Sequence, residues 1–456
     1  MKQAKEAFDE ARKHQCQEFI LQKTRNLNSA QKIKFWKEFN QLFKKKSDQT
    51  MEPLADKDGR ILTDNSNMEE LMFSTFFEGR HLKDANFDDD FYLETNRIYS
   101  EIIQLKEDTD AGDNEPLKDL NSEITEIEVK AAIRKYNANG KSSDKEQFNP
   151  KMCKHLGPKA LKYIKKLANL CLNKGKWIWN KSEVIFLRKG GKESYAKPGS
   201  YRPISISSYI GKLIEKILAQ RIQSYLNKLG IYDPDQEGFK AAHNTIRYLN
   251  RLVLGINSDK QKKLTSICLF IDFEKAFDSV WKKGLIVKLH KLGIKGKILH
   301  LIDDFLMNRK LTININGVIG NIRQGSDVGL PQGSALSPVL FRIYVLDLAA
   351  KLNEREDVTI FKFADDGTIK ANAISTPACL QTFSIILKTV DAWAKKWRMI
   401  INCQPDKTEV IAFNTAEQDP NLIPTTFKLG ENTINRVHHT KALGLIRPEP
   451  RLYRAQ

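Results

Sequence analysis

Two apolar, β-rich runs that each lead into aspartate constrain this chain more than any other feature. Residues 264–271 read Leu-Thr-Ser-Ile-Cys-Leu-Phe-Ile and stop at Asp272. A second run, residues 358–363, is followed by Ala-Asp-Asp-Gly at 364–367 and then by Thr-Ile-Lys. An Asp-Gly step between two such runs is a strong hairpin signal. We therefore predict two buried strands that end in carboxylates, with Asp365 and Asp366 at a tight hairpin tip.

These aspartates are candidate metal ligands. An Asp-Asp-Gly tip by itself is usually only a turn. If the pair lies beside Asp272, however, three carboxylates would repel one another unless cations lay between them. Two divalent ions about four ångströms apart would neutralise that charge and clamp the attacking and leaving oxygens of a phosphoryl transfer. Oxygen ligands favour Mg²⁺, with Mn²⁺ as a substitute, so Asp272, Asp365 and Asp366 form a predicted metal site.

A glycine-rich loop, residues 325–338, lies between the two strands in sequence. Its glycines at 325, 329 and 333 would let the backbone approach a ligand closely, and Gln332 offers a neutral donor and acceptor. The position of this loop between the carboxylate strands makes it a candidate substrate loop.

The charge is unevenly distributed along the 456 residues. Residues 1–150 carry 24 basic and 30 acidic side chains, whereas residues 151–456 carry 50 and 26. A solvated surface alone does not need so large an excess of one sign, so the second part is predicted to bind a polyanion such as nucleic acid.

Several protein classes are disfavoured. The chain has no run of eighteen apolar residues and no apolar segment near its start, which argues against a membrane span or a secretory signal. Its six cysteines are scattered without a Cys-x-x-Cys pair, which favours an intracellular, reducing environment over a disulfide framework or a zinc site.

The remaining pattern predicts helices before the first strands. The first 50 residues have helical spacing, and the acidic segment 51–120, which includes Asp88-Asp89-Asp90, favours a solvated linker or a loosely packed layer. Thr125 and Glu128 form a predicted capping box for a helix closed by Asn139-Gly140. Further expected elements are an amphipathic basic helix at 155–175, a strand at 183–187 with a basic turn at 188–192, and a helix at 209–226.

Three segments resemble the signature motifs of one enzyme family. Asp272-Phe-Glu-Lys-Ala-Phe-Asp-Ser-Val280, Gly329-Leu-Pro-Gln-Gly-Ser-Ala-Leu-Ser-Pro338 and Phe363-Ala-Asp-Asp366 are similar to those of reverse transcriptases of non-long-terminal-repeat (LINE and jockey-like) retrotransposons. The resemblance covers roughly residues 120–446. It extends in the expected order to 201–205, 236–239, Trp393, Trp397, Asn402, Lys407 and Thr408.

This resemblance implies a right-hand polymerase of the α+β class that copies an RNA template into DNA from a primer 3′ hydroxyl, using deoxynucleoside triphosphates. It implies an N-terminal extension or linker at 1–120, fingers at 121–262, a palm with an antiparallel sheet at 263–385, and the end of the palm with the start of a truncated thumb at 386–456. Such an enzyme would act in the nucleus and cytoplasm, with no membrane partner.

The resemblance also assigns roles to residues. Asp272 and Asp365 would hold the metal pair, with Asp366 in support. Lys407 matches a basic residue that protonates the departing pyrophosphate, although a plain salt bridge is nearly as good an explanation. Phe277 matches the bulky position that screens the sugar 2′ hydroxyl, and a buried palm aromatic is the alternative. The implied nucleotide-binding residues are Arg202, Lys189, Phe273, Phe277, Gln332 and Gly333, with Arg188 and Lys192 as supporting phosphate contacts.

Three departures from the family pattern bear on function. Gly367 follows the Asp pair where an acidic or apolar residue is usual, residues 141–148 lack the expected Pro-Gly-x-Asp-Gly pattern, and the chain stops where a helical thumb is expected. The sequence therefore leaves two main hypotheses open: an RNA-directed DNA polymerase, and a decayed or repurposed fragment that binds nucleic acid without catalysis. An RNA-dependent RNA polymerase is a third, disfavoured by the bulk of Phe277.

Overall fold

The computed structural model describes residues 50–79, 86–105, 115–135, 148, 150–231, 235–238, 243–413, 422–442 and 445–448. The chain divides into two units, residues 1–52 and 53–456, and the structure described below is that of the second. The helices predicted in the first 50 residues, the Asn139-Gly140 helix end and residues 141–147 lie outside the described residues.

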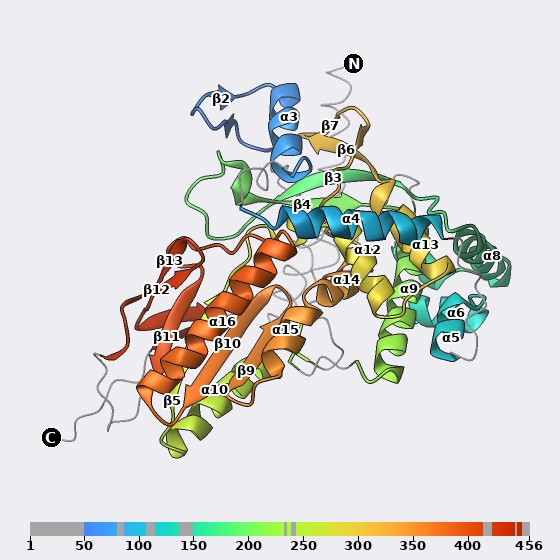
Figure 1. Cartoon of the computed structure of the whole chain (residues 1–456). Coiled ribbons are helices and arrows are strands. Elements are labelled where there is room, and N and C mark those ends of the chain that lie inside the picture. The colour runs from blue at the N-terminus through green and yellow to red at the C-terminus, as the bar shows by residue number, and fades with distance from the viewer. Residues whose placement is uncertain are drawn as a thin grey trace, which may run out of the picture. The chain divides into compact units, whose positions relative to one another are not determined.

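The second unit mixes helices and strands (Figure 1), which confirms the predicted α+β class. Its strands are β1 (Leu54–Ala55), β2 (Ile61–Leu62), β3 (Lys181–Arg188), β4 (Tyr201–Ile206), β5 (Thr265–Ile271), β6 (Lys310–Ile315), β7 (Val318–Ile319), β8 (Arg323–Gln324), β9 (Val358–Phe363), β10 (Asp366–Ala373), β11 (Glu409–Phe413), β12 (Thr426–Leu429), β13 (Asn432–Asn435), β14 (His439–Ala442) and β15 (Leu445–Pro448). Its helices are α3 (Asn65–Phe76), α4 (Asp89–Gln104), α5 (Glu115–Asn121), α6 (Glu126–Arg134), α7 (Pro150–Lys154), α8 (Pro158–Lys174), the 3₁₀ turn η2 (Pro198–Ser200), α9 (Tyr209–Lys228), α10 (Thr245–Gln261), α11 (Ala276–Ser279), α12 (Lys282–Lys291), α13 (Lys297–Met307), α14 (Ser337–Tyr344), α15 (Leu346–Asn353) and α16 (Thr376–Lys396).

A four-stranded antiparallel sheet of order β11-β5-β10-β9 carries the predicted carboxylates. Helices α15 and α16 pack against β9, β10 and β5 on one face, while α10 contacts β9 and β5 (Figure 1). All seven residues of β5 are buried, because the strand is central in the sheet and its alternate side chains enter two apolar clusters. Ile267, Leu269 and Ile271 belong to the larger cluster, and Cys268 and Phe270 pack with α10.

A second sheet of five strands has the order β4-β3-β6-β7, with β8 also paired to β6. Strands β3 and β4 are antiparallel, with Leu187 opposite Arg202, and β3 runs parallel to β6. Helix α9 begins shortly after β4 and packs with α5, α6 and α14.

Several local predictions are confirmed. The basic helix is α8, the strand is β3 and the longer helix is α9. Thr125 and Glu128 form the expected capping box at the start of α6, although this helix already ends at Arg134.

Part of the acidic segment is well packed rather than loose. Met68 and Met72 on α3 are fully buried, and α4 packs along α12. Asp88, the first residue of the Asp run, caps α4 by accepting a hydrogen bond from the Phe91 N–H at 2.9 Å. The run therefore has a structural role at a helix start.

Candidate active site

Asp272 lies directly after β5 and is held on both its backbone and its side chain. Its N–H donates to Thr408 Oγ1 at 3.2 Å, and its carbonyl accepts from the Asn402 N–H at 2.8 Å. Its carboxylate accepts from Asn402 Nδ2 at 3.1 Å and pairs with Lys407 Nζ at 3.2 Å. The structure therefore brings the distant 402–408 segment to Asp272, and in this state Lys407 forms the salt bridge that was the alternative to its proton-donor role.

The predicted hairpin is present, but its turn lies one residue earlier than the predicted Asp365–Asp366 tip. Ala364 and Asp365 form the turn, and Asp366 already pairs with Phe363 as the first residue of β10. Ala364 adopts a positive φ of 59°, which is unusual for a residue with a side chain. Gly367 pairs with Ile271, does not have a positive φ, and has open space where a Cβ would stand. The glycine is therefore not what forms the turn.

The strand register brings the carboxylates together. Because Gly367 is opposite Ile271, one further step places Asp366 opposite Asp272 on the same side of the sheet. Partial exclusion of water by the surrounding protein, together with the charges of Asp365 and Asp272, raises the pKa of Asp366 to about 6. The pKa of Asp365 is also raised, by desolvation and by Asp272, against the opposing effect of Arg202.

The donor set fits a hard divalent cation. Within the part of the chain that the structure describes, no three acidic, histidine or cysteine side chains lie close enough together to hold a metal ion as they stand. All three candidates nevertheless offer carboxylate oxygens, which hard cations prefer as ligands. The Lys407 ammonium pairs with the Asp272 carboxylate and so offsets part of the negative charge of the three aspartates. The three aspartates therefore fit a hard divalent cation in their chemistry.

Cationic side chains from the five-stranded sheet face this acidic cluster. Arg202 on β4 is exposed and its charge acts on Asp365. Lys189 follows β3 and donates through Nζ to the Gly199 carbonyl at 2.9 Å. Burial and the nearby charges of Arg202 and Lys192 lower the pKa of Lys189. Predicted phosphate-binding residues and predicted metal ligands thus lie close enough to influence one another.

In the glycine-rich loop the close approach is to other protein segments. The Gln332 side chain donates from Nε2 to Asp278 Oδ1 at 2.8 Å, and the Gln332 backbone carbonyl accepts from the Ser205 N–H at 2.8 Å. Gly333 has a φ of 98°, and a Cβ there would come within 3.1 Å of the Ser205 carbonyl oxygen. Gly333 is therefore needed to join the loop to β4.

Two aromatic residues of the Asp272 motif are partly exposed. Phe277 stacks on Phe341 with ring centroids 4.7 Å apart and planes 14° apart. Phe273 lies 6.0 Å from Trp393 between ring centroids. The stacking agrees with the packing interpretation of Phe277 and also fixes the orientation of the ring that would face a sugar.

The sequence did not reveal what holds the hairpin tip. Gln236, fully buried, accepts from the Ala364 N–H through Oε1 at 2.8 Å and donates from Nε2 to the Ala364 carbonyl at 3.2 Å. A Cβ on Gly238 would stand 2.3 Å from Ala364 N, so only glycine allows this approach. The resemblance had singled out this segment, but nothing in its spacing showed a contact with residue 364.

The Gln236 segment is itself anchored by charge. Glu237 accepts from Arg251 at 3.0 Å and from His243 Nδ1 at 2.5 Å. Both backbone groups of Lys362 on β9 hydrogen-bond to the segment. The Lys362 N–H donates to the Asp235 carbonyl, and the Lys362 carbonyl accepts from the Glu237 N–H, each at 2.8 Å. Helix α10 and the segment therefore both contact β9 and support the β9–β10 hairpin.

Carboxylates at adjoining strand ends, faced by cationic side chains, form an arrangement that suits divalent cations and phosphate groups. The family model described as "Reverse transcriptase (RNA-dependent DNA polymerase)" matches residues 187–446, which include all of these residues. The chain belongs to this reverse transcriptase family.

Curated relatives agree with this assignment. The chain is 28% identical over 250 residues to the probable RNA-directed DNA polymerase from transposon BS of Drosophila melanogaster, covering 54% of this chain and 27% of that protein. It is 27% identical over 289 residues to the RNA-directed DNA polymerase from mobile element jockey of the same species, covering 62% and 31%. With the jockey protein of Drosophila funebris it shares 27% over 332 residues, covering 71% and 35%. The chain thus spans about a quarter to a third of the length of these relatives.

Among the described residues, no helix is both long and apolar enough to serve as a membrane span.

Proposed function

We propose that this chain carries the nucleotide-adding centre of an RNA-directed DNA polymerase of a retrotransposon, which extends a DNA primer on an RNA template with deoxynucleoside triphosphates. The observation that supports this most is the strand register that places Asp366 opposite Asp272, with Asp365 next to it, at one end of the central strands β5 and β10, where the charge of Arg202 acts on Asp365. Binding of nucleic acid alone would not need carboxylates directed at a phosphate site.

In this proposal the four-stranded sheet with α15 and α16 is the palm of a right-hand polymerase. The β3–β4 hairpin and the helices α6 to α9 belong to the fingers. The palm supplies the carboxylates and the fingers supply Arg202 and Lys189, so a nucleotide would bind between them.

Each side chain has a separate task. Asp272, Asp365 and Asp366 would hold Mg²⁺, which when bound lowers the barrier to in-line attack by neutralising charge on the attacking and leaving oxygens. Arg202 presents a planar guanidinium to phosphate oxygens. Phe277, fixed by Phe341, would close the space beside C2′ of the sugar.

The test is extension of a labelled DNA primer on an RNA template in Mg²⁺ and in Mn²⁺. We expect Asp272→Asn and Asp365→Asn each to abolish extension, since loss of a metal ligand removes several kcal/mol of transition-state stabilisation. Binding of the RNA–DNA hybrid should stay nearly intact. Asp119→Asn on α5, which removes an exposed carboxylate paired with Lys228, is the matched control.

Substantial extension by Asp272→Asn would show that the site is misassigned. Tight hybrid binding by the unaltered protein with no extension in either metal would favour the non-catalytic alternative.

A further inference from the structure

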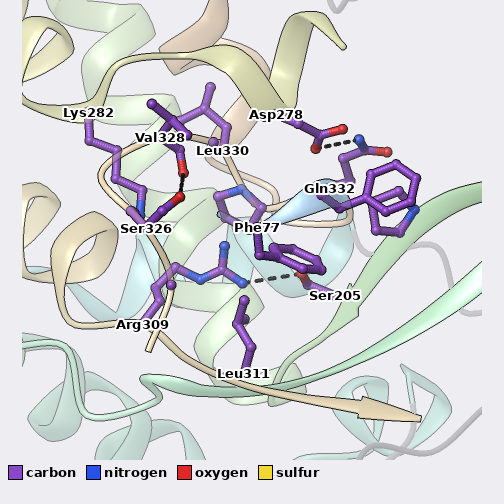
Figure 2. A pocket seen from close by; sticks show the side chains of 15 residues that line it. Phe77, Ser205, Asp278, Lys282, Arg309, Leu311, Ser326, Val328, Leu330 and Gln332 are labelled. Carbon is purple, nitrogen blue, oxygen red and sulfur yellow. Dashed lines mark hydrogen bonds between the residues drawn. The ribbon is translucent and has the colours of Figure 1, made fainter. Parts of the chain in front are cut away.

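A second cationic pocket lies beside the glycine-rich loop (Figure 2). It encloses about 390 Å³ of empty space, counting the part open to solvent, between the end of α3, strand β4 and residues 325–332. Its two cations are Lys282, the first residue of α12, and Arg309, which directly precedes β6.

Both cations bond only to neutral oxygens in the part of the chain that the structure describes. Lys282 is 3% exposed, and its Nζ donates to the Ser326 carbonyl at 2.5 Å. Arg309 donates from one terminal nitrogen to Ser182 Oγ at 3.0 Å and to Ser205 Oγ at 3.2 Å. Neither forms an ion pair with a described residue.

This arrangement is electrostatically unfavourable without a ligand. Burial and the charge of Arg309 lower the pKa of Lys282 to about 7 against the opposing charge of Asp327, and burial lowers the pKa of Arg309 to about 10 against that of Glu215. Asp278 also lines the pocket, but its carboxylate turns towards Gln332, away from Lys282 (Figure 2). A buried lysine beside a partly buried arginine, neither of them hydrogen-bonded to a carboxylate of the described residues, indicates a place for an anion from outside the chain.

The strand geometry separates this pocket from the nucleotide-facing cations. Pro203 and Ser205 line the pocket, whereas Arg202 directly precedes Pro203 in β4 and therefore lies on the other face of the strand. Glycine at 325 leaves space beside the ammonium, since a Cβ there would stand 3.9 Å from Lys282 Nζ. The anion is thus a phosphate other than the triphosphate proposed to meet Arg202.

We infer that Lys282 and Arg309 form a binding site for a backbone phosphate of the nucleic acid on which the enzyme acts. This inference rests on the proposed function for the identity of the ligand. Phosphate would neutralise both cations at once, and the planar fork of Arg309 suits two phosphate oxygens. The site would fix the position of the strand without reading its sequence.

The test is equilibrium binding of labelled RNA–DNA hybrids by Lys282→Met as salt is varied. Loss of one phosphate contact should reduce the slope of log affinity against log salt by about 1, equally for hybrids of unrelated sequence. The melting temperature of the free variant should rise, because a buried charge without an anionic partner has been replaced by an apolar chain. Lys283→Met is the matched control, since the neighbouring Lys283 is partly exposed, 3.8 Å from Asp327, and outside the pocket. We expect this control to keep the original slope.

If Lys282→Met fails to fold, Lys282→Gln keeps a donor for the Ser326 carbonyl and is measured in its place. A folded variant with unchanged affinity and slope overturns the inference. An increase in the KM for deoxynucleotides with unchanged hybrid binding overturns it as well, since the pocket would then serve the triphosphate. The binding assay involves no chemistry, so its outcome is independent of whether primer extension supports the proposed function.

Discussion

Replacing Gln236 with leucine tests whether the buried amide keeps the catalytic hairpin in its active form. The substitution roughly conserves volume but removes both hydrogen bonds to Ala364. Each such bond contributes about 0.5–1.5 kcal/mol net, so the turn loses about 1–3 kcal/mol. The positive φ of Ala364 opposes the turn by about 1–3 kcal/mol, which makes these two bonds comparable with the strain they offset.

We therefore expect the maximal extension rate of Gln236→Leu to fall by about 5- to 150-fold, taking 1.4 kcal/mol for each factor of ten in the population of the active turn. Single-turnover extension at saturating nucleotide measures this rate. Nucleotide KM and hybrid affinity should change little, because the Gln236 side chain is fully buried and bonds to the hairpin backbone. Gln236→Glu, which can still accept from the Ala364 N–H, should lose less, and Gln381→Leu on the exposed side of α16 should lose nothing. A full extension rate in a folded Gln236→Leu protein of lowered stability would refute the reasoning and leave Gln236 as a packing residue.

Other predictions concern discrimination, pH and salt. Phe277→Val should admit ribonucleotides while still adding deoxynucleotides; unchanged discrimination in a folded, active variant would leave Phe277 as a packing residue only. Burial raises the pKa of Asp278 to about 6 in the folded protein. The contribution of Asp278 to the free energy of unfolding is therefore greatest below about pH 4, where the carboxyl is protonated in both states, and is lost as the pH rises through 6. Asp278→Asn should therefore be more stable than the unaltered protein at pH 7.5 in urea unfolding, by up to about 3 kcal/mol, with the difference disappearing near pH 4. Binding of RNA and of RNA–DNA hybrids should weaken steeply with salt, and a flat dependence would contradict the charge argument.

The main strands and the acidic site could be predicted because their signals are local. The run that forms β5 is apolar on both faces, as expected for a strand covered on both sides, and the carboxylate comes where that run stops. The hairpin was predicted for a partly wrong reason. Asp366-Gly367 is a good turn sequence, but the turn formed at Ala364, whose strained backbone is supported by contacts from elsewhere.

The features that could not be predicted from the sequence depend on contacts between residues far apart in the chain. Gln236 and Ala364 are 128 positions apart, and no periodicity links them. Lys282 and Arg309 look like ordinary members of a basic chain, and only the burial of Lys282 and the position of both in one pocket distinguish them from surface lysines and arginines. Gln332, by contrast, was predicted as a ligand-facing group, yet its amide bonds to Asp278, a partner that the loop sequence does not reveal.

The bonds between Lys362 and the 235–237 segment also bear on how this protein behaves at high concentration. Strand β9 is at the end of the four-stranded sheet, and an open sheet edge offers backbone groups on which another chain can add a strand. At Lys362 both outward-facing backbone groups are already bonded, to Asp235 and Glu237, within the same molecule. The segment that supports the catalytic hairpin thus also obstructs intermolecular strand pairing, and a chain in which it detached would expose an aggregation-prone edge directly beside its active site.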